Sequence, residues 1–558
     1  MKVFQIAALA LPLWTAVAHE LSNYEWRHKC PQLRPIVPKI RKEIPGLDEY
    51  LSSEEFLQIS VARLSGAVKI DTTSQTWWQD LPGKDPVWEP MSHFRNYLEK
   101  TFPLIHRHLD LERVNTHGLV YTWKGSKPSL KPYLFLAHQD VVPAPAETFS
   151  EWTHPPFSGF FDGKYVWGRG AIDCKTTLIA SMSAVESLLS FGYAPQRTLV
   201  LAFGFDEEIS GLQGAKRIAE HLAERYGNDG IALLVDEGPG IFHHKKFSTT
   251  YAVPGLSEKG IFNANISVHM ESGHSSLSAG YNSITVMAAL VGKINDNQLR
   301  GQIQAHDPFL QAVFCLGQHV PGLPKLWTNA IESVDKKEAL INTLLPTVMH
   351  MMPALKPLAD NTQALTMIQG GDKINVIPER TTLSINHRLH LGTSVEQMMA
   401  HLEQIVKDYV ANISAAEGGP KLTLRGWSEE ETVNSIKLTA LPGTLEASPV
   451  TSFSVNGTVN GTTPYSVLQG TIRSVYDEGN LTLVAPISMP ANTDSRHYWD
   501  LTQHIFRFNP GHDMTDATDN QIESNAHKIN ERANIVGHVN GVRWYSMFIR
   551  NMDEAKLA

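Results

Sequence analysis

The chain has 558 residues, which exceeds one ordinary hydrophobic core, so two domains are expected. Its 42% hydrophobic and 19% charged residues are values typical of a globular protein. A net charge of −9 at pH 7 argues against a nucleic-acid-binding surface.

The N-terminus has the pattern of an export signal. Met1-Lys2 is a short positive start, and the apolar run that follows ends at Ala16-Val17-Ala18, a small-x-small cleavage pattern. The run is short for a membrane span. We therefore expect a signal peptide over 1–18 that is cleaved; a retained signal anchor is the alternative. An N-terminal extension over 19–70 follows.

Further along the chain, several apolar segments end in acids or histidine. The segments before His138-Gln139-Asp140, Asp173, Glu207-Glu208 and Asp236 are the four cases. Apolar runs of this kind predict buried parallel strands, and ligands of an open α/β sheet bind at the carboxyl ends of its strands. The set predicts one pocket rich in carboxylate and imidazole groups, which suits two divalent metal ions, most simply zinc.

Each motif also has an ordinary structural interpretation. A lone His-x-Asp is often a surface turn, a Glu-Glu pair is often solvated, and Asp173 could be the N-cap of the helix predicted after it. The joint occurrence of the motifs favours the metal site. Within it, Asp140 can orient His138, and one of two adjacent glutamates can bind metal while the other acts as general base.

The segments Phe-Leu-Ala-His138-Gln-Asp140, Gly-Arg-Gly-Ala-Ile-Asp173, Asp-Glu207-Glu208-Ile-Ser-Gly and Leu-Val-Asp236-Glu-Gly resemble the dizinc exopeptidase family of glutamate carboxypeptidase and aminoacylase. Within it they are most similar to the Gly-Xaa carboxypeptidases of the carboxypeptidase S type, and also to the secreted N-acyl amino acid amidohydrolases. The resemblance runs from about residue 47 to the C-terminus. It implies an α/β fold with a mixed, largely parallel sheet flanked by helices, and an inserted smaller α+β lid domain.

The resemblance also implies a role for each residue of the pocket. Asp173 bridges two metals, and a cis peptide often follows it in the family. The expected metal ligands are His138, Asp173, Glu208, Asp236 and His527, the general base is Glu207, and Asp140 orients His138. For the late histidine, His527 is favoured because it begins a family-like His-x-x-x-Glu stretch, and His512, in a Pro-Gly turn that suits a solvent-facing loop, is the competitor.

After residue 257 the pattern changes to alternating strands and a helix from about 394 to 410. We expect the catalytic domain to comprise 71–257 and 438–558, with the lid, which resembles the dimerisation domain of relatives, over 258–437. The stretch 300–360 has helical propensity but no clear place. A homodimer through the lid is an option, although this long stretch could block that surface.

Three further groups of side chains are candidates for substrate contact through the resemblance. His274, in a Gly-His-Ser motif, matches an imidazole that stabilises the oxyanion. Asn375 and Arg388 match lid residues that contact the substrate carboxylate or carbonyl. Arg496 is a second candidate for clamping the carboxylate, which arginine binds bidentately, or it pairs with a nearby acid.

Five Asn-x-Ser/Thr sequences, at Asn265, Asn412, Asn456, Asn460 and Asn480, favour an N-glycosylated chain in the vacuolar lumen or outside the cell. The three cysteines are not a disulfide framework. Cys30 and Cys315 are the only plausible pair, and whether they join stays open.

The predicted function is that of a zinc-dependent carboxypeptidase, which hydrolyses the C-terminal amide bond of small Gly-Xaa-type peptides through a metal-bridging hydroxide. The alternative within the same enzyme class is an N-acyl amino acid hydrolase, or aminoacylase. A metal-free, peptidase-like binding module is the remote alternative.

Overall fold

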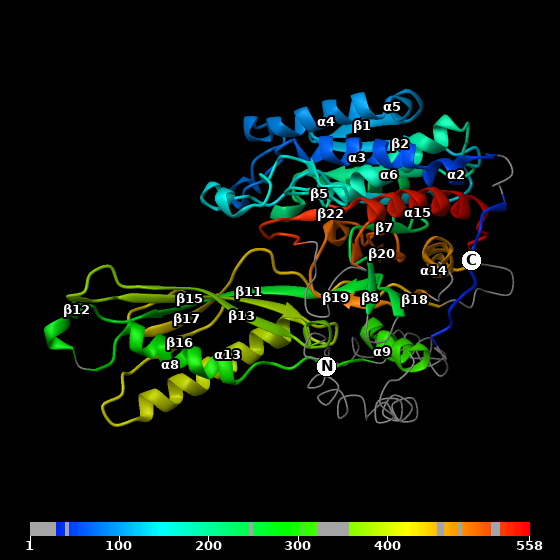
Figure 1. Ribbon diagram of the computed structural model, residues 1–558. Helices are drawn as coiled ribbons and strands as arrows, with labels where there is room; N and C mark the ends of the chain where they lie inside the picture. The colour runs from blue at the N-terminus through cyan, green and yellow to red at the C-terminus, as the bar shows by residue number, and fades with distance from the viewer. Residues whose placement is uncertain are drawn as a thin grey trace.

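The computed structural model describes residues 30–39, 44–244, 249–278, 280–304, 306–320, 356–454, 462–477, 482–514 and 525–557. The expected signal peptide and the sequences at Asn456, Asn460 and Asn480 lie outside these residues. Among the described helices, none combines the length and apolar character needed to cross a membrane. Figure 1 shows two parts, a layered α/β body and an elongated lid that projects from it.

The α/β body is built on an eight-stranded sheet with the order β1-β2-β6-β3-β7-β20-β10-β19. Its four central strands, β6, β3, β7 and β20, run parallel to one another. The strands are β1 (Asp110–Val114), β2 (Gly118–Trp123), β3 (Tyr133–His138), β6 (Leu199–Gly204), β7 (Leu234–Asp236), β10 (Gly255–Glu258), β19 (Ile487–Met489) and β20 (Ile505–Arg507). This confirms the predicted mixed, largely parallel sheet.

Helices cover both faces of this sheet because its central strands are apolar on both sides. In β3, Phe135 and Ala137 face one core, and Leu134 and Leu136 face the other. Figure 1 shows α6 and α15 packed side by side on the first face. That layer comprises α3 (Glu54–Val68), α6 (Lys175–Ser190), α14 (Pro464–Tyr476) and α15 (Ile535–Glu554), whereas α7 (Ala215–Tyr226) packs on the second.

Smaller elements surround the two faces. The second, four-stranded sheet has the order β18-β9-β8-β21. A three-stranded sheet, β22-β5-β4, lies next to the segment that carries Asp173. Their bounds are β4 (Phe160–Phe161), β5 (Tyr165–Trp167), β8 (Ile241–His244), β9 (Thr249–Ala252), β18 (Thr482–Val484), β21 (Asp513–Met514), β22 (Arg532–Asn534), α2 (Leu47–Leu51), α4 (Glu89–Thr101) and α5 (Pro103–His108).

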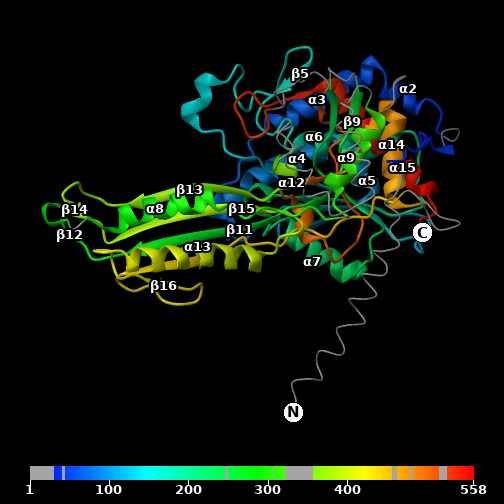
Figure 2. The same cartoon turned by 90° about the horizontal axis from the view of Figure 1, so that it is seen from below.

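The lid is a five-stranded sheet with the order β13-β15-β11-β17-β16, covered by α8 and α13. Figure 2 shows it extending away from the body, with β12 and β14 at its tip. Its elements are β11 (Gly260–His269), β12 (Gly273–His274), α8 (Ser283–Asp296), β13 (Thr362–Gly370), β14 (Val376–Ile377), β15 (Arg380–Leu389), α13 (Val395–Ala415), β16 (Thr423–Arg425) and β17 (Ser435–Ala440). Capping boxes at Asn282 and Ser394 begin the two helices.

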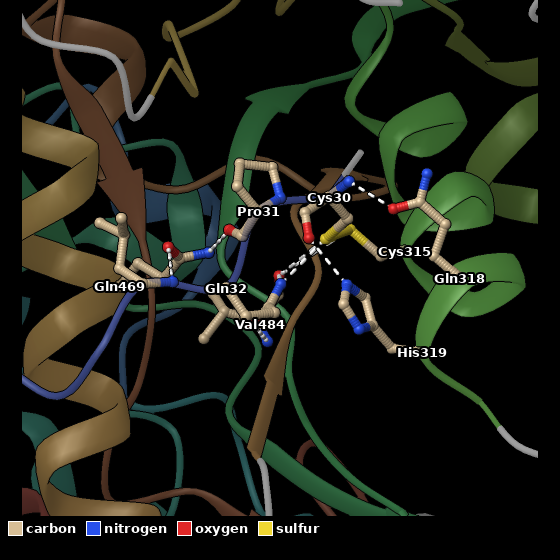
Figure 3. The surroundings of a disulfide bond; sticks show 9 residues. Cys30, Pro31, Gln32, Cys315, Gln318, His319, Gln469 and Val484 are labelled. Carbon is tan, nitrogen blue, oxygen red and sulfur yellow. Dashed lines mark hydrogen bonds between the residues drawn. A yellow bond between two sulfur atoms is a disulfide. The ribbon is translucent and has the colours of Figure 1, made fainter. Parts of the chain in front are cut away.

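The described part of the stretch 300–360 does not extend the lid sheet. Helix α9 (Pro308–His319) packs against β19 and β18 of the body, and α12 (Lys356–Ala359) leads into the edge strand of the lid. A disulfide joins Cys30 to Cys315 of α9. Figure 3 shows the surroundings of this bond, in which the Cys30 backbone N–H donates to Gln318 Oε1. The pair left open by the sequence is therefore formed.

Candidate metal centre

Asp173 lies between two histidines that come from distant parts of the chain. Its Oδ1 atom is 3.1 Å from Nε2 of His138, and its Oδ2 atom is 3.1 Å from Nε2 of His527. His138 ends β3, whereas Asp173 lies in a turn just before α6, not at the end of a strand as the sequence suggested. The peptide bond from Asp173 to Cys174 is cis, as the resemblance implied.

Glu208 completes the same group. Its Oε2 atom is 3.2 Å from Nε2 of His527, and single ligand atoms of His138, Asp173 and Glu208 all lie within 4.8 Å of one another. This set of two imidazoles and two carboxylates has the donor types that bind zinc and similar divalent ions. The arrangement therefore fits a metal centre shared through Asp173.

The pKa shifts in this group come from burial of the acids and from their contacts with the two histidines. Burial would raise the pKa of Asp173, but hydrogen bonds from His138 and His527 lower it below its usual value. Hydrogen bonds to Asp173 and Glu208 raise the pKa of His527 to about 11. Burial, followed by the charge of Asp173, raises the pKa of Glu208 to about 8. A divalent cation bound between these groups would neutralise the acids.

The structure does not bring Asp236 into this group, where the sequence predicted it. Its Oδ2 atom accepts from the Ser495 backbone N–H at 2.9 Å, and its Oδ1 atom accepts from that of Glu237 at 2.8 Å. Instead, Oε1 of Glu237 lies 3.5 Å from Nε2 of His138. Neighbouring residues at a strand end point to opposite sides, so only one of these two acids can face the centre.

The carboxylate of Asp140 organises the surroundings of the centre. Its Oδ1 atom lies 3.3 Å from Nδ1 of His138 and accepts from the Glu207 backbone N–H at 3.0 Å. Its Oδ2 atom accepts from the Glu208 backbone N–H at 3.2 Å and from Ser74 Oγ at 2.7 Å. The hydrogen bond of His138 Nδ1 goes to the Asp140 backbone carbonyl at 2.9 Å, so this residue orients His138 with its carbonyl and holds the backbone of both glutamates with its carboxylate. Ser74 has no sequence signal beyond an ordinary Thr-Thr-Ser run, so sequence reasoning missed it.

Glu207 is buried and faces an arginine. Its Oε1 atom lies 3.1 Å from Nη2 of Arg496, which the 3-10 helix η10 (Asp494–His497) carries. Burial raises the pKa of Glu207 to about 7, and the charge of Arg496 opposes this shift. The sequence left open whether Arg496 clamps the substrate carboxylate or pairs with a nearby acid. In this structure it pairs with Glu207.

Glu531, the last residue of the His-x-x-x-Glu stretch, fastens this stretch to the turn of Asp173. Its Oε1 atom accepts from the backbone N–H groups of Ile172 and Asp173, at 3.1 and 3.2 Å. Its Oε2 atom forms a buried ion pair with Nη1 of Arg169 at 2.6 Å. The sequence motif predicted His527 as a metal ligand, and the structure places it beside Asp173. The role of Glu531 as a tether was missed.

His512, the competing histidine, lies outside the His138–Asp173–Glu208 group. Its Nε2 atom is shielded from solvent and has no hydrogen-bond partner among the described residues. Burial lowers the pKa of His512 to about 4. His512 is half-buried just before β21, which pairs with β8, whereas the sequence suggested a solvent-facing loop.

The lid does not bring its three candidate residues together. Arg388 pairs with Ile261 at the end of β11 that joins the body, whereas His274 and Asn375 lie beyond the opposite end of the same strands. Ten residues of strand span about 30 Å. Figure 1 accordingly shows β12, which carries His274, at the tip of the lid, far from β7 and β22. Within one chain, His274 is exposed and contacts Ser276, away from the Asp173 group.

Fold and site together define a class of protein: an α/β metallohydrolase with acids and histidines gathered near the carboxyl edge of its sheet. Residues 134–551 match the peptidase family M20/M25/M40, and the chain belongs to this family. It is thus a metallo-exopeptidase.

Several proteins resemble the chain over most of its length. Carboxypeptidase S of Saccharomyces cerevisiae is 35% identical over 542 residues, which cover 94% of this chain and 89% of the relative. The N-fatty-acyl-amino acid synthase/hydrolase PM20D1 of Bos taurus is 32% identical over 516 residues, 91% of this chain and 90% of the relative. The M20 family metallo-carboxypeptidase Sso-CP2 from Sulfolobus solfataricus has the same fold, with a TM-score of 0.58, 16% identity, and coverage of 89% and 99%.

Proposed function

We propose that the protein is a metal-dependent carboxypeptidase that cleaves the C-terminal amide bond of small peptides of the Gly-Xaa type. The observation that carries this proposal is the combination of a two-histidine, multi-carboxylate centre with two arginines beside Glu207. Carboxypeptidase S, which is 35% identical over nearly the whole chain, supports the same function.

In this proposal two divalent cations, most simply zinc, share Asp173. His138 and Glu237 would complete one coordination shell, and Glu208 and His527 would complete the other, so Glu237 replaces Asp236 in the ligand set. When bound, the cations would polarise the scissile carbonyl and make water acidic enough to ionise near neutral pH. Asp140 would keep the His138 ring in the orientation that presents Nε2 to the centre.

Glu207 is the proposed general base. Its carboxylate is adjacent in sequence to Glu208 but faces Arg496 instead of the histidines. It would accept the proton of the attacking water and return it to the leaving amine, and a pKa raised toward neutrality suits both transfers.

Arg388 and Arg496 are the proposed receptor for the substrate's α-carboxylate. They lie close enough that Arg496, after burial, contributes to a lowered pKa of Arg388. Arg388 has no ion pair with any acid in the described residues, and its Nη1 atom donates to the neutral Asn492 Oδ1 at 2.8 Å. Two neighbouring cations, of which Arg496 pairs with Glu207 and Arg388 with a neutral amide, favour binding of a further carboxylate.

The substrate preference can be tested with the purified protein. We expect blocked Gly-Leu-type dipeptides to be cleaved with a higher kcat/KM than long-chain N-acyl amino acids. The reverse order would favour the N-acyl amino acid hydrolase instead, a function supported by the 32% identity to PM20D1. Equal turnover of a peptide and its C-terminal amide would contradict carboxylate recognition.

A homodimer through the lid is part of the proposal. The edge strand β13 is largely exposed and carries Met367 and Ile368, which are 57% and 58% exposed. An unpaired edge with apolar side chains is a surface that favours a partner strand. Because His274 is distant from its own centre, a catalytic role for it would require a second copy or a large lid movement. Met367→Lys should yield monomers by light scattering if the edge is the interface.

We further propose that the protein resides in the vacuolar lumen or is secreted and N-glycosylated. The Cys30–Cys315 disulfide suits an oxidising compartment. Of the two described glycosylation sequences, Asn412 is exposed on α13, whereas the Asn265 side chain donates to Ser384 Oγ at 3.2 Å. Asn412 is thus the better acceptor. Glycosidase treatment of Asn412→Gln and Asn265→Gln variants would test this by mass.

A further inference from the structure

Asn492 lies between the lid and the turn that carries Arg496, and its side-chain amide contacts the lid twice. Its Oδ1 atom accepts from Nη1 of Arg388 at 2.8 Å, near the end of strand β15. Its Nδ2 atom donates at 2.8 Å to the backbone carbonyl of Lys259, which joins β10 of the body to β11 of the lid. Because one amide offers a donor and an acceptor in a fixed plane, the two contacts together determine its orientation.

The turn after Asn492 is held firmly to the body. Oε1 of Glu258 accepts from both the backbone N–H and the hydroxyl of Thr493, at 2.8 and 2.7 Å. Oε2 of Glu258 pairs with Nη2 of Arg507 at 3.2 Å, and both side chains are fully buried. Asn492 therefore stands next to a turn that is anchored to the body. The same turn continues to Arg496, which pairs with Glu207.

A neutral amide at this place has a chemical consequence. Guanidinium carries five N–H donors, and the contact with Asn492 uses one of them at Nη1. The amide oxygen can orient Arg388 without neutralising its charge. A carboxylate in the same position would form an ion pair with Arg388 and compete with any anionic ligand.

We infer that Asn492 is a positioning residue. It orients Arg388 of the lid without neutralising its charge, so that Arg388 can bind the α-carboxylate of the substrate. The inference rests on the proposed carboxypeptidase function, and it assigns to Asn492 a part in substrate affinity instead of bond cleavage. Asn492→Asp keeps the shape of the side chain but supplies the competing carboxylate, and Asn492→Ala removes the support.

The test uses the full chain with its metals and a blocked Gly-Leu-type dipeptide. For Asn492→Asp we expect KM to rise roughly 10- to 100-fold, the scale of one charged hydrogen bond, with kcat within about threefold of the wild type. Asn492→Ala should also raise KM with little change in kcat, but by a smaller factor. In an Arg388→Ala background, Asn492→Asp should add almost no further loss, since the two residues act as a unit.

Asn386→Ala is the matched control, because Asn386 lies on the same strand and donates to Asn263 Oδ1 at 2.7 Å, away from Asn492. It should leave KM and kcat nearly unchanged. If Asn492→Asp lowers kcat as much as it raises KM, loses metal, or adds fully to Arg388→Ala, Asn492 has only a structural role and the inference is overturned. A wild type that cleaves neither peptides nor N-acyl amino acids would overturn the proposed function and, with it, this inference.

Discussion

Asp173 and His527 lie 3.1 Å apart, Oδ2 to Nε2, although they stand at opposite ends of the catalytic sequence. His527 has a positive φ of 61°, and four residues later the buried Glu531 fastens this stretch to the backbone of Asp173. The tail of the chain is thus held against the turn before α6 by a second contact, independent of any metal. This arrangement explains how His527, so late in the sequence, is positioned beside Asp173.

Glu207→Gln should reduce kcat roughly 10²- to 10⁴-fold, the usual contribution of a general base, because a carboxamide cannot accept a proton from water. Metal content should stay near that of the wild type, since Glu207 faces Arg496 and not the histidines. Kinetics combined with elemental analysis checks both parts. Turnover close to wild type with full metal content would refute the assignment.

Asp173→Ala should lose at least one metal per chain and all measurable activity. The substitution removes the carboxylate that contacts both His138 and His527, and two nearby cations would then repel each other without it. Metal stoichiometry of the purified variant is the decisive measurement. Retention of both metals would mean that Asp173 acts only as a structural residue before α6.

His527→Ala should reduce metal occupancy and abolish hydrolysis, whereas His512→Ala should keep the metal. Of these two histidines, His527 is the one that contacts Asp173 and Glu208 in the described residues. His512 is half-buried, so its removal should lower the melting temperature slightly through lost packing. Metal analysis of both variants, with thermal unfolding, separates the two roles; metal loss in His512→Ala alone would show that the wrong histidine was chosen.

Glu237→Gln and Asp236→Asn form a second matched pair. Glu237→Gln should weaken metal binding, because Oε1 of Glu237 faces Nε2 of His138. Asp236→Asn should retain metal and lower stability, since its carboxylate accepts from the Ser495 backbone N–H in a buried position. Titration with a competing chelator compares the two affinities. Weaker metal binding in Asp236→Asn than in Glu237→Gln would restore Asp236 as the ligand.

The amino-acid sequence by itself determined the class of fold and most of the chemistry of the site. Apolar runs that end in His138 and Glu207 predicted central parallel strands because the pattern of burial is local to each strand. The order of acids and histidines along the chain was enough to predict a metal centre around Asp173. It was also enough to favour His527 over His512.

Only the tertiary structure decided which of two adjacent acids faces the metal centre, and how far His274 of the lid lies from that centre. Asp236 and Glu237 are adjacent, and their directions depend on the backbone rotation at the end of β7, which the packing of the 493–496 turn sets. Motif matching joined His274 to the site, but the length of β11 separates them. The pairing of Cys30 with Cys315 and the contact of Ser74 with Asp140 likewise arise from packing between distant segments, which no local pattern in the sequence encodes.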